Sequence, residues 1–371
     1  MAIDLQRERA ALDWFEERRD EFLSALRQAR DHQDDTQVLE LATSFAPFLT
    51  RRSYWDEGEA VLEWAVDSAR RSEQPHTAAV MLNELGTVHR LQSRFEQAAR
   101  EFEQALTQFR DLDDPTGEAR ALSNLGLTLR KLGLSDSARD AFQASIERWE
   151  QVENQEERQF GLARATNNLG MSLRDAGDYN QAKALFDQAL ELREQMGDAE
   201  GFSRTLNNLG QLASLEHDPA RASSLHADAL EIRRGLGDQH GVARTAGQLA
   251  TALAQLRRLD DATELLEEAM SIRQALGDRY GEAQTAVQMA GVDRVRGDSG
   301  TALRLATLAS ELAQELGEPR LVAQALLEVG DISAGSGRPE AARAAWAGAL
   351  ERFREIGADR DAQSVEERLG E

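Results

Sequence analysis

Apolar residues followed by a small residue recur along the chain at an almost constant interval. The small members of these pairs are Gly86, Gly126, Gly170, Gly210, Ala250, Ala290 and Gly330. Five of the six intervals are 40 residues, and the interval from Gly126 to Gly170 is 44. A regular interval of this length is the sequence signature of a repeat architecture. The chain is therefore predicted to be an array of similar units rather than one globular core.

Three further positions keep a fixed register within each unit. An alanine lies 12 residues after the small residue, and another small residue lies 19 after it. Between them, at offset 16, stands a larger side chain in six of the seven units: Phe102, Phe142, Phe186, His226, Leu266 and Trp346. The unit of Ala290 has Ala306 there. These offsets share one helix face, where small residues allow close helix approach and a bulky one fills the space beside them. Each unit is therefore predicted to be a helix A, a tight turn and a helix B.

The segments between the predicted helices carry the signals of helix ends. Gly197-Asp198, Gly237-Asp238 and Gly277-Asp278 each stand where one helix B should end and the next helix A begin. Glycine suits the left-handed position after a helix, and aspartate caps the helix that follows.

The predicted fold class is all-α, a solenoid of about eight helix-turn-helix repeats. An earlier unit, in which Ala60 and Trp64 follow the helix B pattern, brings the number to eight. Residues 1–33 are predicted to form one amphipathic capping helix, over 4–31, and residues 358–371 a second cap, because end repeats would otherwise expose core. The repeats are placed within 34–357, at about 34–75, 76–115, 116–159, 160–198, 199–238, 239–278, 279–318 and 319–357.

These small and large positions resemble the tetratricopeptide repeat (TPR), over about residues 36–357. The 40-residue period, longer than the usual 34, is similar to that of kinesin light chains and Pins-type adaptors. The phrases Ala189-Leu190-Glu191-Leu192-Arg193 and Asn207-Asn208-Leu209-Gly210 most resemble the C-terminal arrays of bacterial signal-transducing NTPases of the STAND and NB-ARC kind. The resemblance implies a right-handed superhelix whose A helices line a concave surface. The phosphate-binding loop of those NTPases needs a lysine directly after a glycine. The sequence has two lysines, Lys131 and Lys183, and neither follows a glycine, so this loop does not occur in it.

Composition narrows the functional classes. A net charge of −23 argues against binding to nucleic acid or to an anionic membrane. There is no cysteine, which excludes disulfides and thiol catalysis, and no motif of a hydrolase, a zinc enzyme or a dinucleotide-binding enzyme occurs. The start has no basic region followed by an apolar run. We therefore expect a cytoplasmic, bacterial binding protein with no catalytic activity, cofactor or metal.

The candidate ligand site follows from the resemblance, because helix A would place the positions six and two before the small residue in the groove. The first position holds Arg120, Arg164, Arg204 and Arg244, and the second holds Asn124, Asn168, Asn208 and Gln248. Each pair is spaced i,i+4 and shares one helix face. Arg130 and Arg174 extend the basic strip. Amides can bond a peptide backbone, a contact that asparagine makes in related clamps, and arginine suits carboxylates. The prediction is an extended peptide or protein partner that is acidic or has a free carboxylate.

Two alternatives remain open at this stage. The arginines can instead bridge to glutamates of the next repeat, and the asparagines can bond between repeats. The chain can also be the ligand-sensing portion of a bacterial signal-transducing NTPase or transcriptional regulator that acts through intramolecular or oligomeric contacts. A further arginine series, Arg193, Arg233 and Arg273, is assigned a structural role at the end of helix B, where the helix dipole favours a cation. His89 and His226 fall on core positions and are expected to pack.

Overall fold

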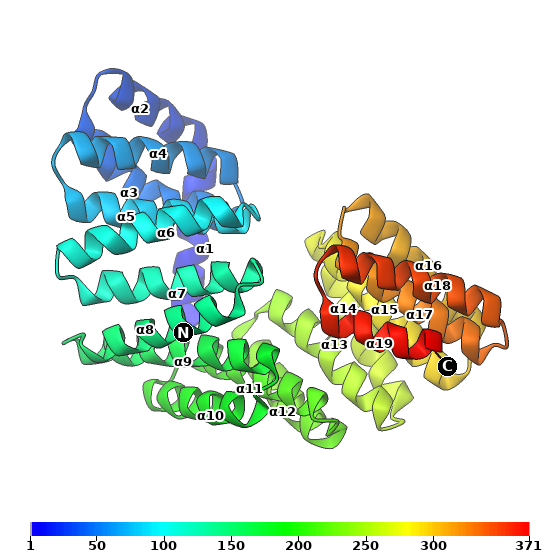
Figure 1. The fold of residues 1–371 in the computed structure, drawn as a ribbon. Coiled ribbons are helices and arrows are strands. Elements are labelled where there is room, and N and C mark those ends of the chain that lie inside the picture. The colour runs from blue at the N-terminus through cyan, green and yellow to red at the C-terminus, as the bar shows by residue number, and fades with distance from the viewer. Residues whose placement is uncertain (1, 371) are drawn as a thin grey trace. The chain divides into compact units, whose positions relative to one another are not determined.

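The computed structural model describes residues 2–370, which form nineteen α-helices and no strand. The all-α fold predicted from the repeat pattern is therefore confirmed. The chain divides into two compact units, Met1–Gln188 and Ala189–Glu371, with the boundary inside α10. Figure 1 shows each unit as a stack of antiparallel helices.

Unit 1 contains two leading helices and then the first A and B helices in alternation. Their bounds are α1 (Ala2–Glu17), α2 (Arg19–Asp31), α3 (Asp35–Arg51), α4 (Trp55–Arg71), α5 (Pro75–Leu91), α6 (Phe95–Asp111), α7 (Pro115–Lys131), α8 (Ser135–Glu150), α9 (Gln155–Ala176) and the first part of α10 (Tyr179–Met196).

Unit 2 continues the alternation and ends in a single helix. Its helices, after the last turns of α10, are α11 (Ala199–Leu215), α12 (Pro219–Leu236), α13 (Gln239–Gln255), α14 (Leu259–Leu276), α15 (Arg279–Arg296), α16 (Ser299–Glu315), α17 (Pro319–Gly335), α18 (Pro339–Glu355) and α19 (Asp359–Gly370).

The N-terminal segment differs from the single helix predicted over residues 4–31. It forms two helices, α1 and α2, which are separated at Arg18. The break lets two aromatic rings reach the same partner in α3: Phe15 and Phe22 lie 5.7 and 5.0 Å from Phe45, measured between ring centroids. A hydrophobic pattern that runs across the break does not reveal it.

The four extra residues between Gly126 and Gly170 belong to the fourth repeat and do not lengthen the connection before it. They lie in helix A of that repeat, since α9 already begins at Gln155 and has 22 residues. The side chain of Asn154 caps it by accepting a hydrogen bond from the Glu157 backbone N–H.

Within each repeat, the size of the helix B side chain matches the size of the helix A residue that it contacts. The rings of Phe102, Phe142, Phe186, His226 and Trp346 lie directly against Gly86, Gly126, Gly170, Gly210 and Gly330. Where helix A has alanine, helix B has a smaller partner: Ala250 packs in one cluster with Leu266, and Ala290 packs in another with Ala306. The small and large positions read from the sequence are therefore the packing contact that defines each repeat.

The glycine at the centre of this contact gives a stability prediction. A Cβ on Gly126 would lie 2.6 Å from Cε1 of Phe142, a ring with no exposed surface. Gly126→Ala should therefore destabilise the protein by a net value of about 1 kcal/mol in urea unfolding, even though alanine favours the helix. Gly58→Ala is the matched control, because its Cβ would lie 3.6 Å from Leu49. It should stabilise by up to about 1 kcal/mol, and the same sign for both variants would contradict the packing account.

The predicted turn chemistry is also confirmed. Gly197, Gly237 and Gly277 have φ of +68°, +71° and +67°. The aspartate that follows each one caps the next helix A, because its side chain accepts a hydrogen bond from the backbone N–H of Gly201, Gly241 or Gly281. Within residues 2–370, no helix has the length and apolar content needed to cross a membrane.

Candidate binding surface

The A helices form one layer in each unit. Alternate helices in this layer contact one another: α5 with α7 and α7 with α9 in unit 1, and α13 with α15 and α15 with α17 in unit 2. Among the described helices, no contact of similar extent joins alternate B helices. Closer spacing on one side of a stack makes that side concave, so the A helices line the concave surface of each unit. The predicted arginine and amide residues all lie on these helices.

Several of the predicted arginines of unit 1 form ion pairs with acidic residues of the A helices. Arg120 pairs with Glu157 at 2.6 Å between Nη2 and Oε1, and Arg130 pairs with Asp175 at 2.7 Å between Nη1 and Oδ2. Arg174 also pairs with Asp175, at 2.8 Å. Burial raises the pKa of Asp175, but these two guanidinium groups outweigh it and hold the pKa below its usual value.

Arg164 lies in a mixed environment. It is half-buried, and its charge and that of Arg120 act on Glu84 of α5. Burial nevertheless raises the pKa of Glu84, although a hydrogen bond from Asn83 and the two guanidinium charges oppose the change. Most of the predicted arginines on the concave surface of unit 1 are therefore already paired with carboxylates of the protein itself.

The predicted amides lie deeper than the arginines. Asn124 donates to Oδ1 of Asn83 on the preceding A helix, at 3.0 Å. Asn168 and Asn208 are each only 6% exposed, and Gln248 is half-buried. These amides thus sit mainly in the joints between A helices, with a small part of each side chain reaching the surface.

Unit 2 has two predicted arginines, and they differ in their neighbours. Arg204 pairs with Glu200 one turn earlier, at 3.6 Å between Nη1 and Oε1. Arg244 is exposed, and the equivalent earlier residue is His240, so no such pair forms. Desolvation by the surrounding protein lowers the pKa of Arg244. The negative charge of Asp238 opposes this change, and the positive charge of Arg204 adds to it. Within the described residues, Arg244 has no carboxylate at ion-pair distance.

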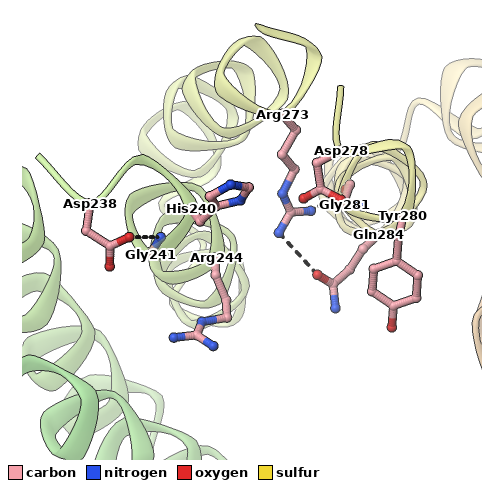
Figure 2. Close-up of a pocket in the computed structure, with 9 residues that line it drawn as sticks. All are labelled: Asp238, His240, Gly241, Arg244, Arg273, Asp278, Tyr280, Gly281 and Gln284. Carbon is pink, nitrogen blue, oxygen red and sulfur yellow. Dashed lines mark hydrogen bonds between the residues drawn. The ribbon is translucent and has the colours of Figure 1, made fainter. Parts of the chain in front are cut away.

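Arg244 faces a pocket of about 300 Å³ between α13 and α15 (Figure 2). The pocket is lined by Asp238, His240, Gly241, Arg244, Arg273, Asp278, Tyr280, Gly281 and Gln284. Arg273 enters from α14, so two arginines from different helices line the pocket, and Figure 2 shows Arg273 directed toward Gln284. Tyr280 stands at the far wall, and burial raises the pKa of its phenol.

Arg273 belongs to a series of three arginines that were expected to interact with the helix dipole. The structure gives these side chains a different role. Arg193, Arg233 and Arg273 are buried, at 2%, 2% and 4% exposure, and each donates from Nη1 to the carbonyl of a glycine in the next helix A: Gly201, Gly241 and Gly281. The helix dipole alone does not require burial. These side chains take the place that Phe109 and Trp149 occupy in earlier repeats, where each ring packs on Gly117 or Gly161. They join one repeat to the next.

The pocket includes His240, Arg273 and Tyr280, which the periodic pattern did not place in the groove, and Gln284, which holds the groove position six before Ala290. A signal for them exists in the sequence. The position of Phe109 and Trp149 changes to arginine in three consecutive repeats, and the glutamate of Glu200 changes to histidine at His240. Changes of this kind at one repeat position indicate where the contacts of one repeat differ from those of its neighbours.

The stacked helix pairs and the concave layer define a helical repeat protein. Two tetratricopeptide repeat models match the sequence, one over residues 49–151 and 161–235 and the other over residues 242–279. Together the matches cover more than half of the chain, so the protein belongs to the tetratricopeptide repeat family. No curated protein matches the sequence.

Solved structures show the same fold at low sequence identity. The Rap conjugation gene regulator of plasmid pLS20, in complex with a Phr peptide, has a TM-score of 0.67 at 12% identity, over 92% of this chain and 96% of that one. The quorum sensor NprR from B. thuringiensis, in its apo form, has a TM-score of 0.62 at 14% identity, over 91% and 99%. A STAND protein with a tetratricopeptide repeat sensor, from Pyrococcus horikoshii, has a TM-score of 0.63 at 15% identity, over 93% of this chain and 52% of that one.

Proposed function

We propose that the protein is a cytoplasmic, non-catalytic scaffold or sensor that binds an extended acidic peptide or protein segment on the concave surface of its A helices. The observation that carries the proposal is Arg244, a cation on the concave surface of unit 2 with no carboxylate at ion-pair distance within the described residues. It faces a pocket in a protein whose net charge is −23. An acidic protein that keeps such a cation on its concave surface has a local site for an anionic partner.

The paired arginines have a compatible role. Arg120 and Glu157 are 54% and 35% exposed, and Arg204 and Glu200 are 45% and 74% exposed. Exposed pairs of this kind contribute little to stability. Arg120 and Arg204 can therefore exchange an internal partner for a ligand carboxylate at small cost. Arg130 and Arg174, at 24% and 12% exposure, and the half-buried Arg164 lie deeper and add positive charge beside them. Asn124, Asn168, Asn208 and Gln248 offer amides at the edges of the helix joints.

The neighbours support a peptide ligand. The Rap regulator of pLS20 was solved with a Phr peptide, and a second Rap protein was solved with the competence and sporulation factor. At 12% identity these structures carry over the fold and no contact residue.

A second candidate function is the ligand-sensing portion of a signal-transducing NTPase. The similarity to the STAND protein favours it, because this chain matches about half of that protein. The discriminating observation is the reading frame of the gene: a phosphate-binding loop encoded in frame with this chain would support the candidate.

The peptide proposal is tested by fluorescence anisotropy with a labelled dodecapeptide of alternating glutamate and alanine, and with its glutamine counterpart. The acidic peptide should bind the full chain about tenfold more tightly, and the charge reversals Arg204→Glu and Arg244→Glu together should remove about that factor. Raising the salt concentration should weaken the binding of the acidic peptide.

The matched control carries Arg304→Glu and Arg343→Glu, two exposed positions on B helices. It has the same change in net charge and should bind like the unmodified protein. Equal loss in both double variants would show a net-charge effect only and would contradict a site on the concave surface.

A further inference from the structure

We propose that the pocket between α13 and α15 is a carboxylate site, in which Arg244 and Arg273 contact the anion from two sides. The inference rests on the proposed function to the extent that the carboxylate belongs to the bound segment, as a side chain or as its C-terminus. Beyond that function, it specifies where the group binds, which chemical group binds there, and a binding role for the buried Arg273.

Arg273 is a buried cation whose hydrogen-bond partners are all neutral. Its Nη1 donates to the Gly281 carbonyl and to Oγ1 of Thr285 at 2.6 Å, and its Nη2 donates to Oε1 of Gln284 at 3.1 Å. Within the described part of the chain, no carboxylate lies at ion-pair distance from it. Burying a charge without a counter-ion is costly, so an anion in the adjoining pocket would lower that cost.

Arg244 supplies the second cation because of one sequence change. In the preceding repeat, Glu200 stands four residues before Arg204 and pairs with it. In this repeat the corresponding residue is His240, which provides no carboxylate, and Arg244 lines the pocket (Figure 2). Burial lowers the pKa of Arg273, the charge of Asp278 opposes this change, and the charge of Arg244 adds a smaller decrease.

The two aspartates that line the pocket are engaged elsewhere. Asp238 accepts a hydrogen bond from the Gly241 N–H at 2.9 Å, and Asp278 accepts one from the Gly281 N–H at 2.8 Å. Each carboxylate caps a helix N-terminus, where the helix dipole already favours negative charge. Among the described residues, neither carboxylate lies at ion-pair distance from Arg244 or Arg273, although the charge of Asp238 acts on Arg244 and that of Asp278 on Arg273.

The remaining polar groups of the pocket also select an acceptor ligand. The amide oxygen of Gln284 is used by Arg273, which leaves its NH2 group to donate. The phenol of Tyr280, 44% exposed, can donate as well. A planar carboxylate accepts from guanidinium and amide donors together and gains from charge-assisted bonds. The volume of about 300 Å³ admits one such group with its neighbouring atoms.

The test uses small carboxylates, so that it does not depend on a peptide. Full-length protein with 15N-labelled arginine is titrated by NMR with N-acetylglutamate amide, which has only a side-chain carboxylate, and with N-acetylalanine, which has only a main-chain carboxylate. The Nε–Hε signals of Arg244 and Arg273 should shift together and saturate with at least one of them, which identifies the source. N-acetylglutamine amide and sodium chloride at equal ionic strength should give no saturable shift.

Two variants make the test specific. Arg244→Gln removes one cation, and His240→Glu recreates the internal pair seen between Glu200 and Arg204; each should weaken carboxylate binding about tenfold or more. Arg304→Gln, at an exposed position of α16 outside the pocket, is the matched control and should bind normally. If Arg244→Gln and His240→Glu bind the carboxylate as tightly as the unmodified protein does, the proposal is wrong. Tighter binding of phosphate than of either carboxylate would also overturn it.

The outcome also separates this site from the proposed function. Saturable carboxylate binding at Arg244 and Arg273 without any binding of the acidic dodecapeptide would leave the pocket standing and refute the peptide groove. Peptide binding that is unaffected by His240→Glu would support the groove and refute the pocket.

Discussion

Arg233→Ala is expected to destabilise unit 2 by about 3 kcal/mol, while Arg233→Phe should keep most of the stability. The arginine is 2% exposed and donates to the Gly241 carbonyl at 3.0 Å, so alanine removes a hydrogen bond and leaves a cavity at a joint between repeats. Phenylalanine fills the same place in an earlier repeat, where Phe109 packs on Gly117. It also removes a buried charge, whose cost is reflected in a pKa of Arg233 lowered to about 10.

The measurement is urea unfolding together with hydrogen exchange resolved to peptides of α12 and α13. In a repeat protein, the loss of one joint should appear first in the helices on either side of it. We expect the phenylalanine variant to be at least about 2 kcal/mol more stable than the alanine variant. If the two variants are equally unstable, the site needs the guanidinium itself, and the equivalence with Phe109 is wrong.

His226 should make unit 2 sensitive to acid, by about 2 kcal/mol between pH 7 and pH 5. The ring is 1% exposed, its Nδ1 lies 3.1 Å from Oδ1 of Asn207, and burial, with a smaller effect of Arg233, lowers its pKa to about 4. The unfolded ring has a pKa near 6.5, so below that value the unfolded state takes up a proton that the folded state resists. The stability that the neutral ring provides is present above pH 6.5 and is lost as the pH falls towards 4.

His226→Phe is the informative variant, since Phe142 and Phe186 occupy the same place in other repeats. Comparing the pH dependence of unfolding of both proteins cancels the titration of all other groups. The difference between them should grow by about 2 kcal/mol from pH 7 to pH 5 in favour of phenylalanine. A difference that does not change with pH would show that His226 titrates normally in the folded protein.

His89 in unit 1 should respond in the opposite direction. It lies 3.0 Å from Glu101 and 3.3 Å from Glu59, and the hydrogen bond to Glu101, against the effect of burial, raises its pKa. Its contribution is full below pH 6.5 and is lost as the pH rises through the folded value. The two core histidines expected from the repeat pattern are both buried, yet burial dominates at His226 and the bond to Glu101 dominates at His89, so their pH responses are opposite.

The repeat and its packing could be predicted from the sequence because they depend on local and periodic information. The contact of Gly126 with Phe142, for example, is set by a fixed offset on two helices joined by a short turn. The break at Arg18 was missed because the apolar face continues through it.

The partners of the surface arginines could not be predicted in the same way. Arg120 reaches Glu157 on the next A helix, whereas Arg204 pairs with Glu200 on its own helix, although both hold the same repeat position. The choice depends on single residues that differ between repeats and on the spacing of neighbouring helices. The pocket beside Arg244 depends on the same non-periodic details, and so it emerges only when α13, α14 and α15 are placed together.

The proposed function is the selection of acidic segments by the concave surface of the A helices. Its most direct test is the composition of dodecapeptides that the full chain selects from an unbiased random library, sequenced before and after selection. We expect enrichment of aspartate and glutamate that disappears when the protein carries both Arg204→Glu and Arg244→Glu, and persists with both Arg304→Glu and Arg343→Glu. Selection of neutral or basic peptides, or acidic enrichment that survives the reversal of Arg204 and Arg244, would contradict it.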